Sequence, residues 1–239
     1  MNALSLAKVP CFVLISSCQF EIAENGQIGV INLNRPNRKN AFGRVMVSQL
    51  REAIEHVAES KEYKVVVLQS LVERCFSAGA DLKERAEMRQ EDVCGFVDGL
   101  RETFSMVEEL PVPTIAAIDG VALGGGFELA LCCDIRYAGS AAKIGLPETR
   151  LAILPAAGGS QRLPRLIGSS KAKELIFTAT ILGPTEAEQY GVVNASIEVA
   201  VDHAMKVAKK IAENGSAIKK RCVMTCRSFG IALRQTGYR

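Results

Sequence analysis

Hydrophobic positions along the chain follow two spacings, one typical of strands and the other of helices. Residues 18–24 and 27–33 predict a hairpin that turns at Asn25-Gly26, because an Asn-Gly pair readily adopts the positive φ angles of a tight turn. Further apolar runs, short and bounded by polar residues, predict buried strands at 64–69, 114–118, 134–138 and 192–197.

Between these strands, apolar residues recur every three or four positions, which predicts helices. Val47, Leu50 and Ile54 mark the first helix, and residues 93–107 mark a long one that ends before Pro111. The same spacing predicts helices at 158–167, 172–178, 185–190 and around 204–211. Strands that alternate with helices in this way are typical of the α/β class.

Composition narrows the class of protein and of partner. The chain has 239 residues, 48% of them hydrophobic and 23% charged, which is typical of one large globular domain. No apolar run reaches membrane-spanning length, so we expect no membrane partner. The formal net charge of +3 is small, and the helix predicted at 44–60 has no lysine. We therefore expect no nucleic-acid partner, and RNA binding is the least favoured function.

Cysteine and histidine usage points away from metal and disulfide chemistry. The eight cysteines form no CxxC pair, and only two histidines are present, so no metal-ligand spacing can be found. The cysteines are interpreted as buried thiols in a reducing compartment. We expect neither a bound metal nor a cofactor.

The candidate chemistry begins where an apolar run ends in Gly124-Gly125-Gly126 and a helical pattern follows. Glycine lets a ligand approach the backbone closely, and a helix that starts there offers free N–H groups and the positive end of its dipole. Glu128 lies in the first turn of this helix, and Glu148 follows after another strand. Two carboxylates beside N–H donors suit acid–base chemistry on a substrate that develops an oxyanion.

These features also have a purely structural interpretation. A strand–Gly–helix junction is a common tight connection, and a glutamate in a first turn often just complements the helix dipole. A second turn of small residues, Ala78-Gly79-Ala80, follows the strand predicted at 64–69 and leaves room for a ligand against the backbone. Since an oxyanion hole normally uses two donors, this second turn favours the catalytic interpretation.

Several segments in order resemble the enoyl-CoA hydratase/isomerase, or crotonase, superfamily. Asn34-Arg35-Pro36 with Asn40-Ala41 is similar to its N-terminal signature, and the other segments are residues 77–81, 116–130 and 155–163. The resemblance extends from about residue 21 to about residue 215. Two more stretches, 81–85 and 172–177, carry a finer likeness to one branch of that superfamily.

The resemblance implies an α/β fold, a crotonase-like spiral of β-β-α units with a shortened C-terminal helical region. We expect the spiral core at 18–198, and a truncated or divergent helical region at 199–239, because residues 222–239 do not resemble the family. Residues 1–17 are expected to form an N-terminal extension containing a partial targeting segment. The family implies the mitochondrial matrix, and the weak N-terminal signal leaves the cytoplasm as the alternative.

Family likeness also assigns site residues. The backbone N–H groups of Ala80 and Gly125 would form the oxyanion hole for a thioester oxygen. Glu128, kept charged by its helix terminus, would be the base, and Glu148, with a pKa raised by burial, would be the acid. The coenzyme A-binding residues would be Ala78, whose carbonyl would face the adenine, together with Asp81, Leu82, Arg38 and Lys39.

The implied function is hydration of a 2-enoyl-CoA thioester by syn addition of water, in the breakdown of fatty acids or branched-chain amino acids. Coenzyme A would then be part of the substrate, and an acyl-CoA thioester the partner. The family also implies a homo-oligomer, a trimer or hexamer, if the shortened C-terminus permits it. The alternative is a catalytically impaired remnant that binds coenzyme A or modulates oligomers.

Overall fold

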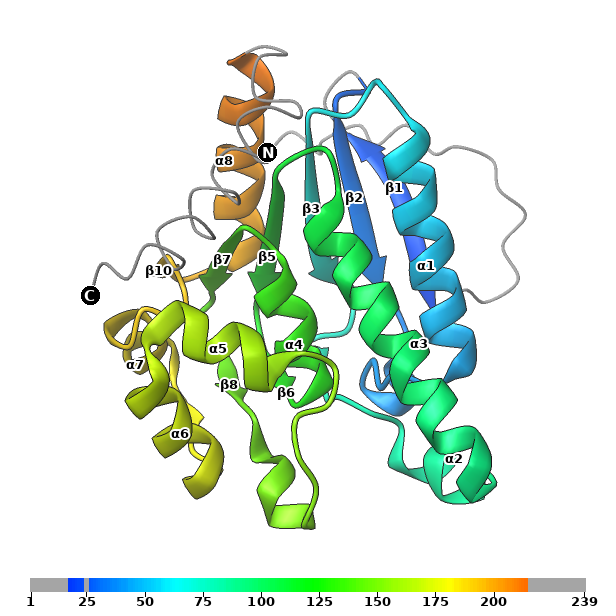
Figure 1. Ribbon diagram of the computed structural model, residues 1–239. Coiled ribbons are helices and arrows are strands. Elements are labelled where there is room, and N and C mark those ends of the chain that lie inside the picture. Colours follow the sequence, from blue (N-terminus) through cyan, green and yellow to red (C-terminus); the bar gives the residue numbers. More distant parts are fainter. Residues whose placement is uncertain (1–16, 24–25, 215–239) are drawn as a thin grey trace, which may run out of the picture.

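The computed structural model describes residues 17–23 and 26–214 (Figure 1). Nearly all of the expected N-terminal extension, the segment 222–239 that was expected to diverge, and Asn25 of the predicted hairpin turn therefore lie outside the described residues. The described part contains two sheets with helices packed around them.

The larger sheet has six strands. In spatial order they are β1 (Cys18–Ala23), β2 (Ile28–Leu33), β3 (Val65–Ser70), β5 (Thr114–Ile118), β7 (Ile135–Ala138) and β10 (Ala195–Ser196). The first pair is antiparallel, as the predicted hairpin requires, and every later pair is parallel. All the predicted strands are present, although the last one is only two residues long.

A smaller sheet combines β4 (Cys75–Ser77), β6 (Val121–Leu123), β8 (Lys143–Gly145) and β9 (Ile181–Leu182). The first three are parallel, and β9 is antiparallel to β8. Successive strands alternate between the sheets: β3, β5 and β7 enter the larger sheet, and the strand that follows each enters the smaller one. This repetition confirms the predicted spiral of β-β-α units.

Helices follow the strand pairs. They are α1 (Arg44–Glu59), α2 (Leu82–Glu87), α3 (Gln90–Glu109), α4 (Gly125–Cys132), α5 (Gly159–Ile167), α6 (Ser169–Thr178), α7 (Pro184–Gln189) and α8 (Ala200–Glu213), with short 3₁₀ turns η1 (Pro36–Arg38) and η2 (Pro147–Leu151). All the predicted helices are found, and α2 is an addition. Within the described residues, none of the helices is both long and apolar enough for a membrane span.

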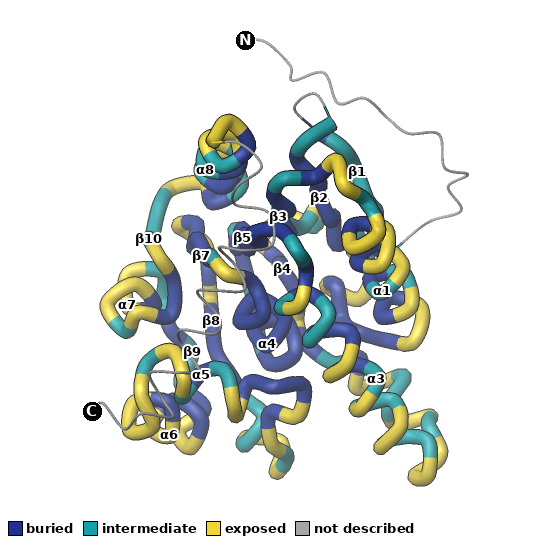
Figure 2. Tube along the Cα trace, turned by 45° about the horizontal axis from the view of Figure 1, so that its top comes forward, coloured by how far each residue is buried: buried dark blue, intermediate teal, exposed yellow. Residues whose placement is uncertain are grey.

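Both faces of the larger sheet are buried. Consecutive strand residues point to opposite faces, so Val66 and Leu68 join the core beneath α1, α3 and α4, whereas Val65 and Val67 face α8. Alanines spaced four residues apart line the inner side of α8, and Figure 2 shows the strands buried between the helices. A sheet covered on both faces explains the continuous apolar runs in the sequence.

The cysteines agree with the sequence prediction in part. The five that lie in the described residues form no disulfide bonds, and four of them are buried. Cys94 is the exception: it is exposed on α3, so the expectation of burial was wrong there.

Gly126, in the first turn of α4, has no room for a side chain. An added Cβ would stand 2.3 Å from the backbone oxygen of Ser77 in β4. We expect Gly126→Ala to lower the free energy of unfolding by about 2–3 kcal/mol, because main-chain atoms would have to move apart. Denaturation in urea measures the change.

Gly95→Ala is the matched control. Gly95 is helical too, but its added Cβ meets nothing within 4 Å, so the substitution should be neutral or slightly stabilising. Equal effects of the two substitutions would contradict the close packing of α4 on β4.

Candidate active site

The junction between β6 and α4 bends sharply at Gly124, which has φ 51° and ψ −126°. Few side-chain-bearing residues adopt this conformation. The Gly124 N–H donates to the carbonyl of Gly145 at 3.0 Å. An added Cβ would also stand 3.0 Å from Oε1 of Glu148, so the missing side chain lets that carboxyl lie against the junction.

The second turn of small residues, Ala78-Gly79-Ala80, lies directly beside this junction. The Phe42 N–H donates to the Gly79 carbonyl at 2.8 Å, and the Asp81 N–H donates to the Phe42 carbonyl at 3.1 Å. In such a parallel bridge the N–H of the middle residue, Ala80, points away from the partner strand. A Cβ on Gly125 would stand 3.7 Å from the Ala80 nitrogen, so the two turns meet.

The meeting of the turns brings together the two N–H groups expected to form an oxyanion hole. Ala80 and Gly125 line the same cavity. Within residues 17–23 and 26–214, neither N–H donates a hydrogen bond. For Gly125 this follows from its place at the start of α4, where helical amides have no partner within the helix.

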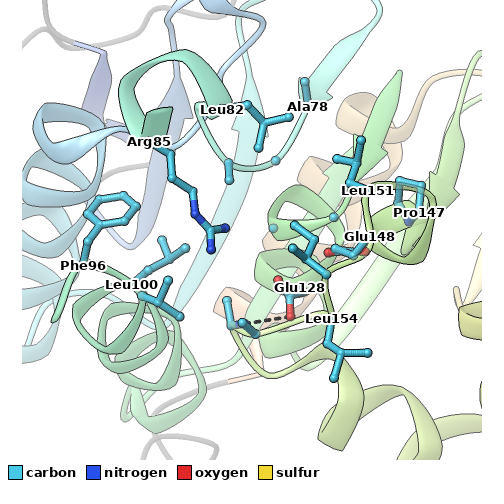
Figure 3. A pocket seen from close by; sticks show the side chains of 18 residues that line it. Ala78, Leu82, Arg85, Phe96, Leu100, Glu128, Pro147, Glu148, Leu151 and Leu154 are labelled. Carbon is cyan, nitrogen blue, oxygen red and sulfur yellow. Dashed lines mark hydrogen bonds between the residues drawn. The ribbon is translucent and has the colours of Figure 1, made fainter. Parts of the chain in front are cut away.

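Glu128 lies at the bottom of the cavity, with only 3% of its surface exposed. Its Oε1 accepts hydrogen bonds from the N–H groups of Ala157, at 2.9 Å, and Gly159, at 2.8 Å; the first is dashed in Figure 3. Burial raises the pKa of Glu128, and the two hydrogen bonds oppose the rise. Burial therefore acts against the effect of the helix terminus, which sequence analysis expected to favour the charged form; the role of Glu128 as the base stays a prediction.

Glu148 reaches the cavity from η2 (Figure 3). Burial raises its pKa to about 7, and the negative charge of Glu128 adds to the rise. This agrees with the pKa predicted from its apolar neighbours. Its Oε2 is buried, and no group among the described residues forms a hydrogen bond with it. Such an oxygen is costly unless a bound molecule supplies the partner.

The rest of the cavity is mostly apolar. The whole cavity, counted out to its open mouth, has a volume of about 680 Å³. The apolar wall comes from α3 and from the loop around η2, namely Phe96, Val97, Leu100, Leu151, Ile153, Leu154 and Ala156. Arg85 of α2 is the one charged lining residue, among those described, that sequence analysis did not select. An apolar pocket with a few convergent polar groups is typical of a small-molecule site.

The residues predicted to bind coenzyme A lie in two different places. Ala78 and Leu82 line the cavity, whereas the carboxylate of Asp81 caps α2 and pairs with Arg35 at 2.8 Å. Arg38 and Lys39 are exposed outside the cavity; the Lys39 carbonyl accepts a 3.0 Å hydrogen bond from the Ala78 N–H. Contact of these residues with coenzyme A stays a prediction.

Comparison with known proteins gives a consistent picture. Residues 23–228 match a family model described as enoyl-CoA hydratase/isomerase, so the match extends into the segment 222–239 that was expected not to resemble the family. Methylglutaconyl-CoA hydratase, mitochondrial, of Mus musculus is 50% identical over 175 residues, which are 73% of this chain and 56% of that protein. Enoyl-CoA hydratase domain-containing protein 2, mitochondrial, of the same species is 47% identical over 193 residues, 78% of this chain and 65% of that protein.

These relatives represent the branch indicated by residues 81–85 and 172–177. The chain spans between about half and two thirds of the length of the first curated relatives it matches. Among solved structures, an enoyl-CoA hydratase from Bacillus anthracis is similar, with a TM-score of 0.81 at 45% identity. That match covers 83% of this chain and 78% of the other, and it confirms the fold.

Proposed function

Because this chain belongs to the enoyl-CoA hydratase/isomerase family, we propose that it adds water across the double bond of a 2-enoyl-CoA thioester. One observation carries the proposal: two backbone N–H groups without partners among the described residues, and two glutamates, line one cavity. The similarity to proteins named hydratases supports it.

The backbone donors act on the thioester oxygen. When water attacks the β carbon, negative charge moves through the conjugated system to this oxygen, where the N–H groups of Ala80 and Gly125 stabilise it. These donors are fixed before the reaction begins, so no reorganisation is needed as the charge develops. The N-terminal dipole of α4 acts in the same direction.

The two glutamates divide the proton transfers between them. Glu128 accepts a proton from the attacking water, whose oxygen forms the bond to the β carbon. Glu148 donates its proton to the α carbon, and its pKa of about 7 leaves it protonated often enough to do so. With both carboxyls on one face of the enoyl group, the addition is syn and the product is a 3-hydroxyacyl-CoA.

The remaining parts of the proposal follow the relatives. Coenzyme A lies along Ala78 and Leu82, near the exposed cations Arg38 and Lys39, and no further cofactor is used. The protein acts in the mitochondrion, where its named relatives are placed. Its place there is in the breakdown of fatty acids or branched-chain amino acids. It assembles as a homotrimer or hexamer.

A hydration assay on the purified chain tests the proposal. Crotonyl-CoA and a short panel of longer 2-enoyl-CoA thioesters are followed by loss of the enoyl absorbance, and coenzyme A binding is recorded by thermal shift. Turnover supports the proposal. Binding without turnover would favour a catalytically impaired coenzyme A-binding protein, and absence of both would overturn each interpretation.

The pKa of Glu148 predicts the pH dependence. As the acid, Glu148 acts only when protonated, and burial raises its pKa from 4.5 to about 7. We therefore expect kcat/KM for crotonyl-CoA to fall by about tenfold per pH unit once the pH exceeds this value. A pH profile of initial rates measures it, with the affinity for free coenzyme A as a control that should change little. A rate that stays constant up to pH 9 or higher would contradict the assignment of Glu148.

A further inference from the structure

The loop that holds the carboxylate of Glu128 is itself held by two arginines. The N–H of Ala157 donates to this carboxylate at 2.9 Å, as dashed in Figure 3. In the same loop, the carbonyl of Ala156 accepts a 3.0 Å hydrogen bond from Nε of Arg101, on α3. The carbonyl of Ala157 accepts one of 3.2 Å from Nη1 of Arg162, on α5. A single stretch of backbone therefore connects a buried carboxylate to two cations.

Arg101 binds the very peptide group that binds Glu128. The carbonyl of Ala156 and the N–H of Ala157 belong to one planar trans peptide, so they point in opposite directions. The guanidinium of Arg101 occupies the carbonyl end, and the carboxylate of Glu128 occupies the N–H end. A cation at the carbonyl polarises the peptide and makes its N–H a stronger donor. Arg101 therefore acts on Glu128 through a single peptide group.

The side chain of Arg162 lies directly against the loop and is only 12% exposed. Its Nε donates to Glu108 at 2.9 Å and its Nη2 to Ser105 at 3.2 Å, both on α3. The remaining nitrogen, Nη1, donates to the carbonyl of Ala157. Gly158 leaves the room for this contact, because an added Cβ there would overlap Nη1. The position of the guanidinium is thus fixed from two helices.

The two arginines also supply positive charge to a carboxylate that lacks an ion pair among the described residues. Burial raises the pKa of Glu128, and besides its two hydrogen bonds the charges of Arg162 and Arg101 oppose the rise. Within the described residues, the titratable groups facing Glu128 are Arg101 and Glu108 on α3, Arg162 on α5, Glu148 on η2, Arg85 across the cavity on α2, and the buried thiol of Cys132 on α4 itself.

We infer that Arg101 and Arg162 are positioning residues for the proposed base: by binding the backbone of residues 156–157, they keep the carboxylate of Glu128 in place and in its charged form. The inference rests on the proposed function, in which Glu128 accepts a proton from water. Neither arginine lines the cavity, so neither would touch the substrate. Without them the buried carboxylate would tend to take up a proton instead.

Arg101→Met is the first test, because its side chain is half exposed and its removal leaves no cavity in the core. Loss of the charge should raise the pKa of Glu128, so that the base is protonated over a wider acidic range. We expect the acidic limb of the kcat/KM profile for crotonyl-CoA to move up by about half a pH unit. The ratio of variant to parent should then be about one third at the acidic end of the profile and near one above about pH 8.

The second test is Arg162→Met, which removes the more buried charge. Its acidic limb should move by about one pH unit, a loss of about tenfold at the acidic end, with KM nearly unchanged. Arg162→Lys keeps the charge and should restore most of the profile. Arg165→Met is the matched control: it removes an exposed arginine of α5 outside the cavity, and its profile should equal that of the parent. Circular dichroism melting checks that each variant is folded, and if Arg162→Met is not, Arg101→Met decides.

The outcomes separate this inference from the proposed function. A loss of rate that is equal at every pH would mean that the arginines only stabilise the loop. That result, or an unchanged profile in both methionine variants, would overturn the inference while hydration stands.

If the parent hydrates no enoyl-CoA, the proposed function fails and a direct titration of Glu128 decides the inference. Nuclear magnetic resonance of isotope-labelled glutamate carboxyls measures its pKa, and the resonance of Glu128 is the one missing from Glu128→Gln. A higher pKa in Arg101→Met and Arg162→Met than in the parent would support the inference, and equal values would overturn it.

Discussion

Replacing Glu148 with glutamine is expected to lower kcat for enoyl-CoA hydration by about 10²- to 10⁴-fold. Glutamine has nearly the same shape, but its amide cannot deliver the proton that the α carbon needs. KM should change little, because the backbone donors and the apolar wall remain in place. Steady-state kinetics with crotonyl-CoA measures both parameters.

The matched control is Glu174→Gln on α6, which makes the same chemical change at an exposed position outside the cavity. Its kinetics should equal those of the parent. The fall in rate above pH 7 should also disappear in Glu148→Gln, since the titrating group is gone. If Glu148→Gln hydrates as fast as the parent, the proton comes from another group.

Gly125→Pro is expected to lower kcat by about 10²- to 10³-fold, the usual effect of losing one oxyanion-hole donor. Proline has no N–H, yet it is tolerated at the first position of a helix, which Gly125 occupies in α4. Turnover should therefore fall much further than stability. Parallel kinetics and urea denaturation compare the two losses.

Gly125→Ala separates the missing N–H from the added bulk. Alanine keeps the donor, and its Cβ would stand 3.4 Å from the nearest atom, Cδ2 of Phe42, which is an ordinary contact. We expect this variant to retain most of the activity. If alanine and proline lower kcat equally, the effect is steric and the Gly125 N–H is not an oxyanion donor.

The longer elements could be predicted because each one carries its own signal in the sequence. α3 is long enough for helical spacing to be visible, and β3 for a continuous apolar run bounded by polar residues. The three-residue strands β4, β6 and β8 are not, since three positions contain no period, and they form only because neighbouring segments pair with them. For the same reason β6 was not predicted as a separate strand, although the structure places β5 and β6 in different sheets.

The site residues, too, could be predicted from the sequence only in part. Glu128 and the glycines beside it form a local motif that can be recognised in the sequence. The groups that hold its carboxylate, the N–H groups of Ala157 and Gly159, lie about thirty residues away and show no side-chain signal. Arg85 was missed because an arginine in a short polar helix is ordinary in sequence, and only the fold turns it towards the cavity.

The backbone from Glu148 to Gly159 has a dual role. Its first residue, Glu148, is the proposed acid. At its far end the backbone N–H groups of Ala157 and Gly159 donate hydrogen bonds to the carboxylate of the proposed base, Glu128. A displacement of this segment therefore moves both groups at once. The positions of the proposed acid and the proposed base therefore depend on the same stretch of backbone, and a change in that backbone would disturb both carboxyl groups together.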